Sequence, residues 1–404
     1  MSTALLASQK SSATAARCVV AAFVCFVVAF CLALCGCGSQ QQANSKPAVA
    51  DGPAWESIDF NHKLKLDYAT QFSVESSDEG YSYIEVKDGL NYLVVPEGAG
   101  VPTGMPDDIA VLQQPLDNVY LAATSAMDAI RSIDAVDHIK LSGTNESGWY
   151  IDEAREAMAS GKMVYAGKYS APDYELISST GCDLAIESTM IYHNPDVKEQ
   201  LERLGVPVFV ERSSYEAHPL GRMEWVKLYG VLFGKLDAAC DFYDNKLAEL
   251  EPVLKQKPCG KTVAFFSVNA AGAVTVHKPG DYIVKSIELA GGTYALDNIK
   301  VDSDSGSFST MNMQLESFFD AASDADILIY NSSIEGELTS MDQLIEKSPL
   351  FEKFKAVKSG DVWCTGKNLF QEGMGLSNLI ADLNRVMTDD SASDDQMSYL
   401  HKLD

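Results

Sequence analysis

Basic side chains are scarce in this sequence of 404 residues. It has 31 lysine and arginine residues against 57 aspartate and glutamate residues, which gives a formal net charge of −26 at pH 7. A polyanion of this kind repels nucleic acid and anionic lipid headgroups, so its own surface is a poor binding surface for either. The charge favours solubility, and we expect no nucleic-acid partner.

The signatures of common catalytic sites are also missing. The sequence has no GxSxG, no HExxH, no GxxxxGK[ST] and no GxGxxG motif after an apolar strand. Carboxylates are so numerous that some must lie near one another by chance, so their presence indicates no acid–base site. We therefore expect a binding protein, with no catalytic residues, and not an enzyme.

Cysteine spacing excludes a zinc centre built from neighbouring thiolate pairs. Beyond residue 37 the four cysteines are far apart, whereas zinc-binding pairs need CxxC-like spacing. The spacing assigns no disulfide among them and predicts no metal ligand. These cysteines are Cys182, Cys240, Cys259 and Cys364.

The one long apolar run, Cys18–Leu34, is too short and too closely followed by polar residues for a stable membrane span. Lys10 and Arg17 precede it, as in an export signal. The sequence Leu-Cys-Gly-Cys at 34–37 resembles a lipobox, with a small glycine before the cysteine that would be lipidated. We expect residues 1–36 to be a lipoprotein signal peptide and Cys37 to carry the lipid. An uncleaved anchor helix is the alternative.

A flexible tether is expected at residues 37–54, which are polar and without periodicity. The protein would then lie on the outer face of the cytoplasmic membrane, held there by its lipid. The following residues 55–115 alternate in the manner of hairpin strands, and they predict a β-rich appendage.

The sequence is rich in helical periodicity after Pro219, where thirty-two residues follow without another proline. Apolar residues recur there at intervals of three and four, which predicts one helix from Glu224 to Leu250 within an interlobe segment 221–255. At about 1.5 Å per residue this helix would span roughly 40 Å, enough to bridge two bodies. An ordinary long core helix within one domain is the alternative.

Short apolar strands alternate with helical patterns on both sides of this segment, as in α/β lobes with mainly parallel sheets. We expect a first lobe at 116–220 and a second at 256–392, each large enough for its own core. The last residues, 393–404, form an acidic tail that should be frayed.

The string GVPVFVERSSYEAHPLGRMEW at 205–225 resembles the crossover of substrate-binding lipoproteins of ABC importers, in the class that handles ferric siderophores, haem and cobalamin. The resemblance runs from Leu116 to Met387 through GKYSAPDYELISSTGCDLAIEST, DYIVKSIELAGGTY and MNMQLESFFDAASDADILIYNSS. It implies two α/β lobes joined by one rigid helix, the class III periplasmic-binding-protein fold.

Ligands of open α/β sheets bind beyond the carboxyl ends of the strands. Aromatic rings there could pack on a macrocycle, and cationic groups could hold carboxylates or catecholates. Each candidate taken singly is more often a surface residue or part of the structure of its own loop. The candidates are Trp149, Tyr192, His193, Arg212 and Tyr215 in the first lobe and Asn269, His277, Tyr282, Asn331 and Lys367 in the second.

A histidine side chain could also bind haem iron, which needs an axial ligand. His193 and His277 lie on loops at this edge and are the candidates. His218 precedes Pro219 and is expected to seat the long helix instead.

Two glutamates carry a further expectation from the resemblance. In the family, an acidic residue on the outer end of each lobe pairs with arginines of the membrane permease, and Glu175 and Glu316 fall at the matching places in DYELI and QLESF. Their position near a helix start is also favoured by the helix dipole, which is the structural alternative.

We therefore predict an extracytoplasmic lipoprotein that captures an iron siderophore or a cobalamin-type corrinoid and delivers it to an ABC permease and its ATPase. It would be a monomer without a cofactor of its own. A haem receptor of the same fold is one alternative, and a cell-surface signalling or adhesion module without transport is another.

Overall fold

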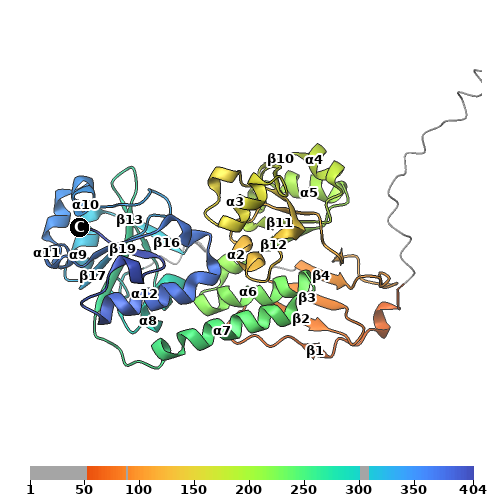
Figure 1. Ribbon diagram of the computed structural model, residues 1–404, viewed down its shortest axis with the longest axis horizontal. Helices are drawn as coiled ribbons and strands as arrows, with labels where there is room; N and C mark the ends of the chain where they lie inside the picture. The colour runs from red at the N-terminus through yellow and green to blue at the C-terminus, as the bar shows by residue number, and fades with distance from the viewer. Residues whose placement is uncertain (1–51, 88–89, 301–308) are drawn as a thin grey trace, which may run out of the picture. The chain divides into compact units, whose positions relative to one another are not determined.

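The computed structural model describes residues 52–87, 90–300 and 309–404 (Figure 1). The lipobox, Cys37 and most of the predicted tether lie outside the described residues. Residues 50–404 form one compact unit. No helix among the described residues is both long and apolar enough to cross a membrane.

The N-terminal region is a five-stranded sheet in the order β1-β2-β3-β4-β5. Neighbouring strands are antiparallel except β4 and β5, which are parallel. Alternate side chains of β2 and β3, such as Val74 and Ile84, enter the main core, whereas Leu93 and Val95 of β4 pack on the other face against Trp55 and Phe60. The strands are β1 (His62–Lys63), β2 (Phe72–Ser76), β3 (Ser82–Val86), β4 (Leu90–Val95) and β5 (Ile109–Gln113).

Two buried carboxylates fasten this sheet to the rest of the unit. Glu224 accepts hydrogen bonds of 2.8 Å from the backbone amides of three consecutive residues, 67–69. Glu216 accepts from the amides of Thr70 and Gln71, and from the indole Nε1 of Trp225 at 3.2 Å. Because five consecutive amides point at two charges, the loop before β2 is held tightly against the helix that follows the first lobe.

The first lobe contains a parallel sheet in the order β12-β11-β6-β7-β8. One face of this sheet joins the main core, and the other packs on a separate cluster that includes Tyr120 and Ile177. The strands are β6 (Val119–Leu121), β7 (Ile139–Ser142), β8 (Val164–Tyr165), β11 (Leu184–Ser188) and β12 (Val208–Glu211), with a small hairpin of β9 (Gly167–Lys168) and β10 (Ala171–Pro172). The helices are α2 (Ala126–Arg131), α3 (Asp152–Ala159), α4 (Tyr174–Thr180) and α5 (Pro195–Arg203).

The predicted continuous helix is wrong, because the segment is a pair of helices, α6 (Pro219–Leu232) and α7 (Leu236–Leu254). Gly234 between them has φ +66°. The amide of Lys235 donates to the carbonyl of Gly230 at 2.6 Å, which ends α6 in a Schellman motif. The helices fold back on each other, since the hydroxyl of Tyr243 on α7 donates to the carbonyl of Leu220 near the start of α6. Only α7 leads into the second lobe.

The second lobe has a seven-stranded sheet in the order β16-β14-β13-β17-β18-β19, with β15 beside β13. Strands β13, β15, β17 and β18 are parallel, and β14, β16 and β19 pair antiparallel. The strands are β13 (Thr262–Val268), β14 (Val274–His277), β15 (Thr293–Tyr294), β16 (Thr310–Met313), β17 (Ile327–Tyr330), β18 (Val362–Thr365) and β19 (Leu400–Lys402). The helices are α8 (Tyr282–Leu289), α9 (Leu315–Ala322), α10 (Met341–Lys347), α11 (Lys355–Ser359) and α12 (Leu376–Thr388).

The acidic tail is ordered, contrary to the expected fraying. Its last residues form β19, which pairs with β18, and Leu400 and Leu403 are buried. Asp382 of α12 accepts hydrogen bonds from the amides of Ser398 and Tyr399 at 2.9 and 2.7 Å. The acidic composition gave no sign of the three buried apolar side chains in this segment, Tyr399, Leu400 and Leu403.

Candidate functional site

The candidate site lies where the carboxyl ends of the parallel strands of both lobes end in loops. In the first lobe these loops contain the short 3₁₀ turns η3 (Glu146–Gly148), η4 (Thr189–His193) and η5 (Ser213–Tyr215). In the second lobe they follow β13, β17 and β18, and the last contains η7 (Lys367–Phe370). Ligands of open α/β sheets bind at this edge.

Exposed apolar side chains gather in these loops. Six of the ten exposed large apolar side chains among the described residues follow strands β7, β11, β12, β17 and β18. Exposed apolar side chains that share one edge of the fold can form a binding surface, whereas scattered single residues need no explanation. We name this set the apolar rim: Tyr150, Met190, Tyr192, Tyr215, Ile334 and Phe370.

Trp149 was predicted to face a ligand, and the structure places it in the core instead. The side chain is 2% exposed, and its Nε1 donates to the hydroxyl of Ser142 at 3.2 Å. The next residue, Tyr150, is 40% exposed and takes the rim position. Tyr150, Met190 and Ile334 were missed because neighbouring loop residues can point to opposite sides and no periodicity shows which one is exposed.

Tyr192 and His193 both lie on η4 and both are exposed, as the prediction requires. Ser188 caps this turn by accepting a hydrogen bond from the amide of Met190 at 3.3 Å. The turn therefore presents Met190, Tyr192 and His193 together at the end of β11.

Arg212 and Tyr215 lie together at the end of β12. The guanidinium carbon of Arg212 is 4.2 Å from the centroid of the Tyr215 ring, in a cation–π contact. Arg212 is 6% exposed and Tyr215 is 40% exposed, so the ring is the more accessible part of the pair. Arg222 fixes the turn, because its NH2 group donates to the carbonyl of Ser214 at 2.7 Å and its Nε to that of Glu216 at 2.9 Å.

Glu211 is a buried carboxyl group that precedes Arg212 at the end of β12. Burial raises the pKa of Glu211, although hydrogen bonds from Ser213 and Ser125 oppose the shift. Its oxygens accept from the amide of Ser213 at 2.7 Å and from the hydroxyl of Ser125 at 3.2 Å. The carboxyl group thereby ties η5 to the loop that precedes α2.

His277 and Tyr282 are engaged in contacts within the protein. His277 is 6% exposed, and its Nδ1 lies 2.6 Å from Oδ1 of Asp281. The guanidinium carbon of Arg222 on α6 lies 3.5 Å from the centroid of the Tyr282 ring. Tyr282 therefore joins the second lobe to α6, and His277 is the more enclosed of the two histidines weighed as haem ligands.

The amide side chains of Asn269 and Asn331 shape their own turns. Oδ1 of Asn269 accepts from the amides of Ala271 and Ala273, and Oδ1 of Asn331 accepts from the amide of Ser333. Lys367 is exposed on η7, and its backbone amide donates to Oε1 of Glu337 at 2.7 Å.

Glu175 and Glu316 occupy equivalent places in the two lobes. Each lies in the first turn of a helix, α4 and α9 respectively, and each is exposed. Both are therefore accessible to a partner, and both also gain from the dipole of their helix.

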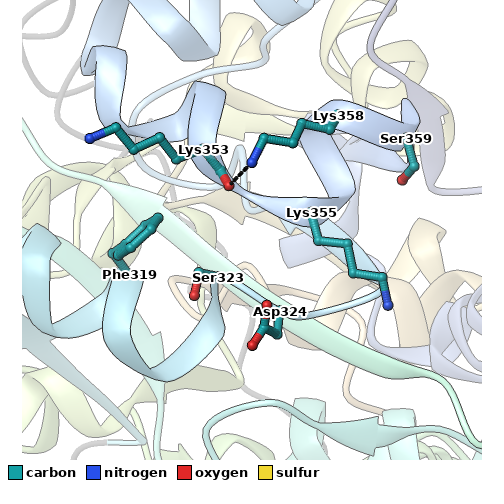
Figure 2. A pocket seen from close by; sticks show the side chains of 7 residues that line it. All are labelled: Phe319, Ser323, Asp324, Lys353, Lys355, Lys358 and Ser359. Atoms are coloured by element: carbon teal, nitrogen blue, oxygen red, sulfur yellow. Dashed lines mark hydrogen bonds between the residues drawn. The ribbon is translucent and has the colours of Figure 1, made fainter.

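A separate cavity of about 500 Å³ lies elsewhere on the second lobe, near the amino ends of β17 and β18 (Figure 2). The ammonium groups of Lys353 and Lys355 point in different directions in this view, and that of Lys358 is hydrogen-bonded to the carbonyl of Lys353 at 2.7 Å. The lysines do not converge on one point, so the cavity is not a built anion site. Among the described residues no three His, Cys, Asp or Glu side chains are grouped to hold a metal ion.

Residues 128–369 match the protein-family model described as periplasmic binding protein. An uncharacterized lipoprotein of Methanocaldococcus jannaschii is 24% identical over 292 residues, which is 70% of this chain and 67% of that protein. A second uncharacterized lipoprotein of the same organism is 23% identical over 397 residues, which is 92% of this chain and 96% of that one.

Solved structures share the fold at low sequence identity. The periplasmic haem-binding protein HutB of Vibrio cholerae has a TM-score of 0.53 at 15% identity, over 67% of this chain and 97% of its own. The petrobactin-binding protein YclQ of Bacillus subtilis has a TM-score of 0.53 at 14% identity, over 68% and 93%. An ABC-type Fe³⁺-hydroxamate transport protein of Saccharomonospora viridis has a TM-score of 0.51 at 18% identity, over 68% and 93%. These matches confirm the predicted fold class.

Proposed function

Because this chain belongs to the periplasmic binding protein family, we propose that it is an extracytoplasmic receptor that captures an iron(III) siderophore and delivers it to an ABC importer. Three proteins of the same fold bear names that refer to petrobactin, to Fe³⁺-hydroxamate and to haem. A corrinoid remains within the proposed ligand class, because it too is a large metal chelate with an extended apolar surface.

The apolar rim is the observation that carries this proposal. Its tyrosine and phenylalanine rings offer broad apolar faces, and the tyrosines add a hydroxyl. Arg212, stacked on Tyr215, adds a cation suited to the carboxylate or catecholate oxygens of a ferric chelate. A ligand that is part ring and part anion fits this combination better than a small sugar or a bare ion.

Haem is the second candidate, and His193 is the residue that favours it. This histidine is exposed on η4 next to Tyr192, so either side chain is accessible to an iron atom. The visible spectrum of the haem-loaded protein, compared with that of the His193→Ala variant, distinguishes axial ligation from simple packing.

The lipid anchor is part of the proposed function, and Cys37 is the residue that would carry it. Two relatives are named lipoproteins, which supports the proposal. Changing Cys37 to Ser should release the protein from the membrane fraction. Retention of this variant after an alkaline wash would contradict the anchor.

Removal of rim aromatics tests the binding surface. Changing both Tyr192 and Tyr215 to Ala should weaken binding of a ferric hydroxamate or catecholate by roughly tenfold or more, since each ring contributes apolar contact area. Leu204→Ala is the matched control, because Leu204 is also exposed but follows α5 outside the rim. Titration followed by tryptophan fluorescence measures the affinity, and equal affinity in both variants would contradict the proposed surface.

A further inference from the structure

The second lobe contacts the first through a short segment that is far from α7 in sequence. We name this segment, Phe370–Met374, the clip; it ends in the 3₁₀ turn η8 (Gly373–Gly375). Gln371, the second residue of the clip, is 1% exposed. Its Nε2 donates to the carbonyl of Gly148 at 2.7 Å, and its Oε1 accepts from the amide of Tyr150 at 2.7 Å. Both the oxygen and the nitrogen of the Gln371 side-chain amide are thus hydrogen-bonded to the backbone of the first lobe.

Tyr150, whose amide is bound by Gln371, and Phe370, which precedes Gln371, both belong to the apolar rim. Tyr150 of the first lobe and Phe370 of the second meet edge to face, with ring centroids 5.8 Å apart and ring planes at 75°. Both rings remain 40% or more exposed. The two halves of the rim are therefore in contact at this point, directly beside Gln371.

The far end of the clip is fixed as well. The amide of Met374 donates to Oδ2 of Asp128 on α2 at 2.6 Å, and Oδ1 of Asp128 accepts from Nε of Arg131 at 2.6 Å. Glu372 accepts from the hydroxyl of Tyr399 in the ordered tail at 2.6 Å. The clip is held by the first lobe on one side and by its own lobe on the other.

We infer that Gln371 is a positioning residue, which holds Tyr150 against Phe370 and so fixes the spacing of the two lobes at this end of the rim. The amide group suits the role because it supplies a donor and an acceptor together. Separation of the lobes here would leave the side chain and two backbone groups without partners inside the protein, and buried polar groups rarely remain so. The consequence for ligand binding rests on the proposed function, but the lobe contact does not.

Hydrogen exchange of the Tyr150 amide tests the inference without any ligand. The acceptor of this amide lies on the other lobe, so its protection reports the lobe contact directly. In the full-length protein the amide should be protected, and Gln371→Ala should accelerate its exchange by roughly tenfold or more. Gln371→Glu keeps an acceptor for the Tyr150 amide but cannot donate to the carbonyl of Gly148, so it should accelerate the exchange less than the alanine variant does.

The matched control is Asn384→Ala. Nδ2 of Asn384 donates to Oε1 of Gln256 and to the carbonyl of Ala290, so this variant also loses two hydrogen bonds, but none of them reaches Gly148 or Tyr150. It should lower the overall stability and leave the local protection of Tyr150 in place. Exchange of Tyr150 at the same rate in the wild type and in both Gln371 variants would overturn the inference.

Ligand dissociation separates this inference from the proposed function. If the wild type binds a ferric hydroxamate, Gln371→Ala should release it roughly tenfold faster, because one side of the rim is no longer held. Unchanged dissociation together with lost protection would overturn the positioning role. If the wild type binds no metal chelate, the proposed function fails, and the exchange experiment still decides whether Gln371 holds the lobes.

Discussion

Glu187 is a carboxyl group enclosed in the first lobe without a described hydrogen-bond partner. The side chain is fully buried, and neither oxygen has a partner within the described residues. It lies at the end of β11, one residue before the serine that caps η4. Burial raises the pKa of Glu187 to about 8, so the group is mostly neutral at pH 7.

This carboxyl group makes stability depend on pH. The unfolded chain releases the proton near the ordinary value of 4.5, whereas the native protein keeps it until about pH 8. The native state therefore binds more protons between these values, and stability falls as the pH rises through this window. The total loss is on the order of 5 kcal/mol.

Glu187→Gln removes the titrating group while keeping its shape. Chemical denaturation at pH 5 and at pH 8.5 should show a smaller difference for this variant than for the wild type. Glu199→Gln on the surface of α5 is the control and should keep the wild-type dependence. An identical pH dependence in the wild type and in Glu187→Gln would show that this carboxyl group ionises freely in the native state.

Residue type alone predicted the exposure of some candidate residues. Tyr192, His193, Tyr215 and Lys367 are exposed at the expected loops, because polar or aromatic residues after a strand were assumed to face outwards. The same assumption was wrong for Trp149, whose indole is held by a serine of the preceding strand. Contacts with residues far away in the sequence decide whether such a side chain is buried, and these contacts cannot be inferred from a single sequence.

At the scale of elements, strands and helices of the two lobes followed the sequence patterns closely. The break between α6 and α7 was missed, although its signal is present: Gly234 follows the apolar residues of α6, in the place of a C-terminal glycine cap. The apolar repeat continues through the break, because both helices bury a face in the same core. The apolar periodicity alone therefore does not reveal this turn, whereas the glycine at position 234 indicates it.

The helix pair depends on the close approach of its two members at Gly230. A β-carbon there would lie 2.7 Å from Cβ of Ala239 and 2.9 Å from Cα of Leu236. Gly230→Ala should therefore lower the free energy of unfolding by about 1–3 kcal/mol, because the helices must move apart. The midpoint of urea unfolding measures this loss.

Gly373→Ala is the control for the loss of a glycine, since a β-carbon at that position meets no atom within 4 Å. This variant should unfold near the wild-type midpoint. Equal stability of the Gly230 and Gly373 variants would mean that α6 and α7 pack less closely than the structure shows.

At the scale of the whole molecule, each lobe has an exposed glutamate in the first turn of a helix, Glu175 in α4 and Glu316 in α9, and we propose that the two dock on the permease. Changing both Glu175 and Glu316 to Ala should leave ligand affinity unaltered, because both residues lie outside the apolar rim on exposed helix starts. Uptake by cells should fall sharply, and more for the double variant than for either single one, because charge pairs set the orientation of docking.

Glu199→Ala and Glu352→Ala form a control pair of exposed glutamates, one in each lobe and neither at a predicted docking position. Cells with this control pair should take up ligand at the normal rate. Normal uptake by the Glu175 and Glu316 double variant would remove the docking role, and loss of ligand affinity would place these glutamates at the binding surface.

The most direct test of the receptor is a binding titration of the purified protein against four chelates: a ferric hydroxamate, a ferric catecholate, cobalamin and haem. Tryptophan fluorescence or calorimetry reports the affinity, and each metal-free chelator serves as the control. We predict micromolar or tighter binding, with a Kd of about 1 μM or below, for a ferric chelate and weaker binding of its metal-free form. Failure of all four compounds to bind would contradict the proposal that this protein is a receptor for metal chelates.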